Sequence, residues 1–269
     1  MYHVYLSPHF DDVALSCGGM AAAHTAAGGR GRCITVFAAP LPPGTPLSAY
    51  VQGQHQRWGD PDAAAANRVR RSEEAAAMAC LGLDLTLLDY PDAIYRADRY
   101  PSDAHLFGPL HAAEVDLPAR LAADLTVILG ALDPAGLTIY APLGLGRHVD
   151  HQIVFQAARH LAGAGWTVQH YEDYPYAAKP AAHATRFAEL GLPAAGPAAP
   201  PIYYDITATL EAKIAAIAAY PSQLSGLFDP VDTMPAAVRA YAAAVAAGWG
   251  GAAYAERCRR LDSPAPGAL

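Results

Sequence analysis

Short apolar runs alternate with longer segments rich in helix-forming residues along the first two thirds of this chain. The first two longer segments end at Gly28 and Gly82, and glycine is a common helix stop. Such alternation predicts a three-layer α/β fold, in which a mostly parallel sheet carries helices on both faces. The expected strands are residues 4–7, 33–37, 85–88, 137–141 and 168–171, and the expected helices are residues 15–27, 67–81, 117–132 and 151–161.

The length of the chain predicts a single domain. With 269 residues and 53% hydrophobic content, residues 1–269 can build one large α/β core. From about residue 193 to residue 269 we expect a C-terminal cover of helices and loops, which serves substrate enclosure, contact between copies in a homo-oligomer, or both. Residues 40–62 are rich in proline and glycine, so we expect a long loop that borders the functional site.

Charge and cysteine usage limit the partners and the compartment. The net charge is −7 and the basic residues are scattered, so no nucleic-acid partner is expected and a small, neutral or weakly charged molecule fits better. The chain shows neither a signal peptide nor a continuous apolar run long enough to span a membrane. The four cysteines have no CxxC spacing, which is typical of reduced thiols in a cytoplasmic protein.

Two motifs carry the residue types of a hydrolytic metal site. The SPHFDD motif of residues 7–12 follows the first expected strand, and the HVDH motif of residues 148–151 follows the fourth. Loops at the carboxyl ends of parallel strands converge, so the two motifs are expected to share one site. Two imidazoles and a carboxylate can hold zinc and leave a position open for water, which the ion acidifies. Iron(II) would also suit these ligands.

Adjacent carboxylates in the first motif need different roles. We assign Asp12 to the metal, together with His9 and His151, and Asp11 to the general base that takes a proton from the attacking water. Spacing alone does not distinguish the two aspartates. Each residue also has a structural interpretation, because an Asp after a strand can cap a helix and a His in a turn is commonly exposed.

The second motif supplies two further candidates for catalysis. A protonated His148 would stabilise the oxyanion or protonate the leaving amine. Asp150 would hold an imidazole in one tautomer and raise its pKa. We therefore expect an acid in this motif to complement the base in the first.

The two motifs together resemble those of the PIG-L or LmbE-like zinc-dependent de-N-acetylases, whose signatures are a PHxDD element near the N-terminus and a distal His-x-Asp-His element, here residues 8–12 and 148–151. The resemblance covers roughly residues 4–224 and implies a Rossmann-like α/β fold. It also implies that His9, Asp12 and His151 are metal ligands, that Asp11 is the base and that His148 assists at the oxyanion or leaving group. Many members have Glu after the Asp pair, whereas this chain has Val13. In those members the Glu is commonly taken to support the loop rather than to bind metal, so we expect zinc binding to survive in this chain.

The family resemblance implies removal of an acetyl group from an N-acetylglucosamine-type amine. The alternatives are an amidase acting on a thiol conjugate or an acylated secondary metabolite, and a sugar-binding homologue that has lost turnover. Candidate substrate contacts are Arg70 or Arg71 before the third strand, Asp92 after it, and Glu172 in a tyrosine-rich run. Each of these four residues also fits a structural role in a turn, on a helix face or at a strand edge.

Overall fold

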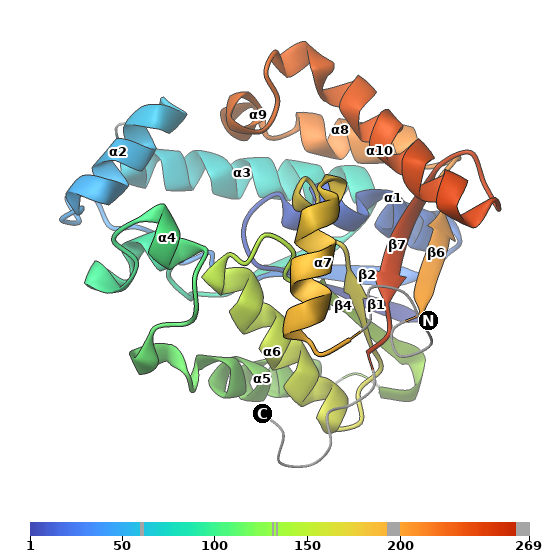
Figure 1. Ribbon diagram of the computed structural model, residues 1–269, viewed down its shortest axis with the longest axis horizontal. Coiled ribbons are helices and arrows are strands. Elements are labelled where there is room, and N and C mark those ends of the chain that lie inside the picture. The colour runs from blue at the N-terminus through green and yellow to red at the C-terminus, as the bar shows by residue number, and fades with distance from the viewer. Residues whose placement is uncertain (60–61, 131, 133, 193–199, 262–269) are drawn as a thin grey trace.

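A seven-stranded sheet forms the centre of the computed structural model, which describes residues 1–59, 62–130, 132, 134–192 and 200–261 (Figure 1). The strand order is β3-β2-β1-β4-β5-β7-β6. The first five strands along the chain pair in parallel, and β7 pairs antiparallel with both β5 and β6. The strands are β1 (Tyr2–Ser7), β2 (Arg30–Thr35), β3 (Asp84–Leu87), β4 (Leu137–Pro142), β5 (Val168–Tyr171), β6 (Pro201–Asp205) and β7 (Ala255–Arg259).

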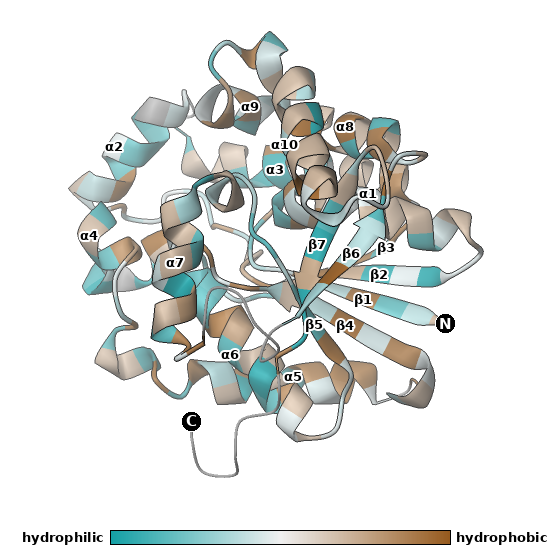
Figure 2. Cartoon of the chain, turned by 45° about the vertical axis from the view of Figure 1, so that its right-hand side comes forward, coloured by the Kyte–Doolittle hydropathy of each residue, from teal (hydrophilic) through white to brown (hydrophobic). Residues whose placement is uncertain are grey.

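Helices cover both faces of this sheet, as the alternating pattern predicted (Figure 2). One layer contains α1 (Asp12–Ala26), α3 (Ala63–Leu81), α8 (Leu210–Ala218) and α10 (Met234–Trp249); the other contains α5 (Leu117–Leu129) and α6 (Val149–Gly163). The central strand β1 serves both layers, because Tyr5 packs into the first layer while Val4 and Leu6 pack into the second. All three side chains are fully buried, and each such burial contributes roughly 1.5–3 kcal/mol.

The remaining helices surround the carboxyl ends of the strands. They are α2 (Ala49–Trp58), α4 (Asp103–Leu106), α7 (Pro180–Glu189) and α9 (Pro221–Leu227). Short 3₁₀ turns occur at Ala93–Tyr95, Ala97–Arg99, Ala112–Glu114, Pro134–Gly136, Tyr176–Ala178 and Val231–Thr233. Within the part of the chain that the structure describes, no helix is long and apolar enough to cross a lipid bilayer.

Helix α1 breaks at Cys17, whose φ of −141° is not helical. The break frees the backbone N–H groups of Gly19 and Met20, which donate to the carboxylate of Glu256 on β7 at 3.1 and 2.6 Å. Lys213 of α8 pairs with the same carboxylate at 2.5 Å, so the buried charge is compensated. A side chain at Gly19 would meet Ile206 at 2.8 Å, so this close packing requires glycine. The C-terminal segment therefore supports the helix that begins at the SPHFDD motif.

Two expectations about irregular or covering segments need correction. Residues 40–62 contain α2, which Ser48 caps by accepting from the backbone N–H of Val51 and which ends at Gly59. Proline and glycine on both sides of this helix made the whole segment resemble a loop. Likewise, the segment from residue 193 onward supplies β6 and β7 to the sheet and is more than a cover of helices and loops. Residues 193–199 and 262–269 lie outside the described residues.

Candidate metal centre

The two motifs lie side by side because they follow adjacent strands. Strand β1 ends at Ser7 and leads into the SPHFDD motif, and its parallel neighbour β4 ends at Pro142 and leads toward the HVDH motif. Since β2 flanks β1 on the other side, the strand order reverses between β1 and β4. Ligands in open α/β sheets gather at such a reversal, outside the carboxyl ends of the strands. The predicted convergence of the two loops is confirmed.

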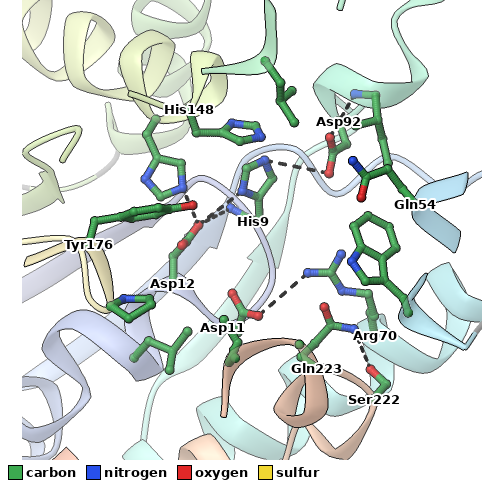
Figure 3. A pocket seen from close by; sticks show the side chains of 18 of the residues that line it. His9, Asp11, Asp12, Gln54, Arg70, Asp92, His148, Tyr176, Ser222 and Gln223 are labelled. Atoms are coloured by element: carbon green, nitrogen blue, oxygen red, sulfur yellow. Dashed lines mark hydrogen bonds and ion pairs between the residues drawn. The ribbon is translucent and has the colours of Figure 1, made fainter. Parts of the chain in front are cut away.

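His9, Asp12 and His151 bring three donor atoms together; we call these residues the triad. The Oδ2 atom of Asp12 lies 3.5 Å from Nδ1 of His9 and 3.3 Å from Nε2 of His151. Ligand atoms of all three residues lie within 4.8 Å of one another, which is compatible with one metal ion. Figure 3 shows Asp12 and His9 turned toward the same point of the cavity.

The ring nitrogen of His9 that does not face Asp12, Nε2, is bound by Asp150 of the HVDH motif. Nε2 of His9 donates to Oδ2 of Asp150 at 2.9 Å, which leaves Nδ1 facing Asp12. The Asp150 carboxylate is fully buried, pairs with Arg96 at 2.6 Å and accepts from the backbone N–H of Ala93. Asp150 therefore orients an imidazole, as expected, but the imidazole belongs to the other motif.

The ring nitrogen of His151 that does not face Asp12, Nδ1, is bound in the same way by Asp173, which follows β5. Nδ1 of His151 donates to Oδ1 of Asp173 at 2.7 Å, so Nε2 faces Asp12. The second oxygen of Asp173 accepts from the backbone N–H groups of Gly144 and Leu145, which belong to the loop that leads to the HVDH motif. One buried carboxylate thus fixes both the imidazole and the loop that carries it.

The protonation of the triad indicates a place for a cation. Burial alone would lower the pKa of His9, but the surrounding carboxylates, Asp92 foremost, raise it well above its usual value. Burial also opposes the charge on His151, yet Asp12 and Asp173 raise its pKa to about 10. The two imidazoles in turn hold the pKa of Asp12 well below its usual range, although burial acts to raise it. The triad thus sets two imidazoles around an ionised carboxylate, and this two-nitrogen, one-oxygen donor set suits zinc or iron(II).

A second group, His9, His148 and Asp150, also lies within reach of a single ion. We do not assign it as a ligand set. Nε2 of His9 is already bonded to Asp150, and Asp150 is neutralised by Arg96. Among the described residues, no arginine forms such an ion pair with the carboxylate of Asp12 in the triad.

Asp11 differs from Asp12 in environment and in pKa. Burial, followed by the neighbouring charge of Asp12, raises the pKa of Asp11 to about 8, although Arg70 acts to lower it. The Asp11 carboxylate lies in the cavity 3.9 Å from the Arg70 guanidinium (Figure 3). A carboxyl that titrates near neutral pH can exchange a proton, whereas Asp12 stays ionised.

His148 stands at the start of α6, where its Nδ1 accepts from the backbone N–H of Asp150 at 3.2 Å. Burial and then the charge on His9 lower the pKa of His148 well below its usual value. The imidazole is therefore neutral, with its Nε2–H available as a donor. Burial and the nearby charge on His9 therefore disfavour a protonated His148, in contrast to the expectation from the sequence.

The triad lies in a cavity of about 400 Å³ whose outer walls come from α2, α4 and α9. Of the predicted substrate contacts, Arg70 and Asp92 line this cavity (Figure 3). Arg71 does not, because its guanidinium donates to the carbonyl of Ala38. Glu172 is buried elsewhere, where it pairs with Arg257 at 2.6 Å and with Arg259 at 3.2 Å. For these last two residues the structural interpretation fits better than substrate contact.

Residues 4–162, more than half of the chain, match the family PIG-L, described as GlcNAc-PI de-N-acetylase. The chain belongs to the PIG-L family. The match contains both motifs and ends before the strands β6 and β7.

Named PIG-L relatives and a solved structure are similar to this chain. Two curated relatives are called 2'-N-acetylparomamine deacetylase: one from Streptomyces fradiae is 33% identical over 174 residues, and one from Niallia circulans is 26% identical over 191 residues. Each match covers 64% of this chain. It covers 56% of the Streptomyces fradiae protein and 66% of the Niallia circulans protein, so the chain spans less than two thirds of the length of each relative. A solved deacetylase of the teicoplanin biosynthesis pathway is 25% identical, with a TM-score of 0.77, over 96% of this chain and 97% of that one.

Four residues outside the predicted ligand, catalytic and substrate-contact sets also lie at this site. Asp173 orients His151, and Glu74 contacts the backbone of Asp11. Trp58 of α2 and Gln223 of α9 line the cavity. No local pattern marks these residues, because the packing of segments far apart in the chain brings each of them to the site. The nearest signal is that Asp173 lies two residues after the end of a strand, β5.

Proposed function

We propose that this chain is a metal-dependent hydrolase that removes the N-acetyl group from an amino sugar or a glycoconjugate. The observation that supports the proposal most directly is the convergence of the triad at the base of the cavity, with Asp11 beside it. We further propose His9, Asp12 and His151 as ligands, with zinc as the metal. The four cysteines are free, which supports a reducing, cytoplasmic compartment.

A divalent cation held by the triad would supply Lewis acidity, which polarises the acetyl carbonyl and acidifies water. The ionised form of Asp11 accepts a proton from the attacking water, because its carboxyl lies in the cavity and its raised pKa, about 8, makes this carboxylate a stronger base than usual. The neutral His148 donates its Nε2–H to the oxyanion that forms from the carbonyl. When the C–N bond breaks, Asp11 returns its proton to the leaving nitrogen. The products are a free amine and acetic acid, which loses its proton to solvent as acetate, and Asp11 is again ionised.

The outer cavity favours a substrate larger than one sugar ring. Trp58 offers an aromatic face for a ring, and Gln54 and Gln223 offer amide groups for hydroxyls. Asp103 adds a carboxylate, which accepts from Tyr50 at 2.6 Å. An amine-bearing second ring would complement this carboxylate. Because two relatives are named for N-acetylparomamine, we propose an N-acetylated aminoglycoside as the substrate class.

The proposal is tested by acetate release from a panel of N-acetylparomamine, N,N'-diacetylchitobiose and N-acetylglucosamine, with zinc and iron contents measured on the same samples. We expect hydrolysis of at least one member by the parent protein and none by His151→Ala. Arg71→Lys, outside the cavity, serves as the matched control and keeps the parent rate. Asp103→Asn should raise KM for N-acetylparomamine selectively.

Two other outcomes would assign another function. A metal-loaded protein that binds these sugars and releases no acetate would be a sugar-binding homologue. Release of longer acyl groups in preference to acetyl would favour an amidase on an acylated secondary metabolite or a thiol conjugate. The similarity in fold to a deacetylase of the teicoplanin pathway makes acylated glycopeptides the first compounds to add to the panel.

A further inference from the structure

Asp11 adopts a backbone conformation that a residue with a side chain rarely accepts. Its φ is 92°, and among the described non-glycine residues only Arg147 also has a positive φ. Such conformations cost free energy and persist where the surrounding structure holds them. Asp11 also precedes the first turn of α1, so its backbone N–H has no partner within the helix.

The partner of this N–H is Glu74 of α3. Oε2 of Glu74 accepts from the backbone N–H of Asp11 at 3.1 Å and from the hydroxyl of Tyr220 at 2.6 Å. Oε1 accepts from the hydroxyl of Thr35 at 2.6 Å. Glu74 is fully buried, so no water competes for these bonds.

The two hydroxyl donors tie Glu74 to distant parts of the fold. Thr35 is the last residue of β2, and Tyr220 directly precedes α9. Both hydroxyls hold the carboxylate in place from sides other than Asp11. The position of the acceptor for the Asp11 N–H is therefore set by the sheet and by two helices, and does not depend on Asp11 itself.

Holding this N–H determines where the Asp11 side chain points. If the bond were lost, the peptide would leave a buried donor unpaired or turn toward another acceptor, with the backbone relaxing to negative φ. Either change would move the carboxyl away from its place beside Asp12 in the cavity. Asp12 would be affected less, because its own carboxylate accepts from the backbone N–H of His9 at 2.7 Å.

We propose that Glu74 is a positioning residue for the reaction: it holds the strained backbone of Asp11 so that the Asp11 carboxyl faces the reacting water. This inference rests on the proposed function of Asp11 as proton acceptor. Glu74 acts by accepting the hydrogen bond at the right distance, and its negative charge is not required.

A reciprocal pair of variants separates distance from charge. Glu74→Gln keeps the length: its amide oxygen can take the place of Oε2, and its NH₂ can donate to the Thr35 hydroxyl, which also accepts. Glu74→Asp keeps the charge but withdraws the acceptor from Asp11 by one methylene. Glu73→Asp is the matched control, because Glu73 is its neighbour on α3 and instead accepts from the backbone N–H and hydroxyl of Ser222.

The readouts are kcat per bound metal ion, KM, metal stoichiometry and the thermal midpoint. We expect Glu74→Asp to lower kcat by about 10²-fold, since a misplacement of about 1 Å can have that effect, with metal stoichiometry and KM retained. Glu74→Gln should keep kcat within a few-fold of the parent, and Glu73→Asp should change the midpoint or KM without a comparable loss of kcat. A purely structural role would lower the midpoint and the metal content together and leave kcat per metal ion unchanged.

Two results would overturn the inference: a Glu74→Gln variant as impaired as Glu74→Asp, or a Glu74→Asp variant with parent kcat. A parent protein that hydrolyses no amide would instead refute the proposed function. In that case, crystal structures of the two Glu74 variants test whether Glu74 positions Asp11. A negative φ at Asp11 in Glu74→Asp supports it, and an unchanged φ of about 90° refutes it.

Discussion

Replacement of Asp173 by Asn should weaken metal binding through the protonation of His151. The two oxygens of Asp173 have separate duties: one accepts from His151 and the other from two backbone N–H groups. Asn has a single acceptor oxygen. If that oxygen stays with the backbone N–H groups, the NH₂ group faces Nδ1 of His151, which must then accept. The imidazole proton moves to Nε2, the nitrogen that faces Asp12.

The expected loss of metal affinity follows from the burial of Asp173 and from the loss of its hydrogen bond to His151. Asp173 is 1% exposed and its bond to His151 is 2.7 Å long, so the loss is not compensated by water. Replacing a carboxylate that orients a ligand imidazole typically lowers metal affinity 10–100-fold, which corresponds to about 1.4–2.7 kcal/mol. We expect Asp173→Asn to fall within this range.

A competition titration of zinc against a fluorescent chelator at pH 7 measures the change. Asp205→Asn is the matched control: the carboxylate of Asp205 also accepts from a backbone N–H, that of Thr207, but it is exposed on β6. An affinity of Asp173→Asn within about twofold of the parent would refute the tautomer argument. An equal loss in Asp205→Asn would show that the effect is not specific to His151.

Three further outcomes are expected. Asp11→Asn should retain the parent metal stoichiometry while kcat falls by about 10²–10⁴-fold; full activity in an acetate-release assay would place the general base elsewhere. Zinc binding at pH 7 should release about two protons, because the raised pKa values keep both imidazoles of the triad protonated, and the zinc affinity should rise with pH toward pH 10. Calorimetry in buffers of different ionisation enthalpy measures the number of protons released, and a release of zero protons would contradict the prediction. Lys213→Met should destabilise the fold by about 3 kcal/mol by leaving the buried Glu256 charge unpaired, whereas Arg239→Met, at an exposed ion pair, should leave the thermal unfolding midpoint unchanged.

Much of the architecture could be predicted from the sequence because its causes are local. Apolar runs such as residues 137–141 alternate with helical segments, and this pattern favours a parallel sheet between helix layers. The convergence of His9, Asp12 and His151 was predictable for the same reason. Both motifs follow strands, and the carboxyl ends of adjacent parallel strands meet at one edge of the sheet.

The choice among neighbouring residues depended on how whole elements pack. Arg70 and Arg71 are adjacent in α3 and point in directions about 100° apart, so only one of them can face the cavity. Their order in the sequence does not say which, because the rotation of α3 is set by its packing against α1 and α8. The helix α2 was missed because proline and glycine flank it, although its own ten residues form a capped helix.

Sequence alone determined which side chains meet at the edge of the sheet, and the tertiary structure decided their hydrogen-bond partners and their charges. Asp150 lies two residues from His148 yet orients His9, which is 141 residues away. Burial, followed by the charge on His9, then lowers the pKa of His148. Strand ends and helix periodicity are properties of short segments, whereas pKa values and tautomers depend on distances of a few ångströms between segments far apart in the chain.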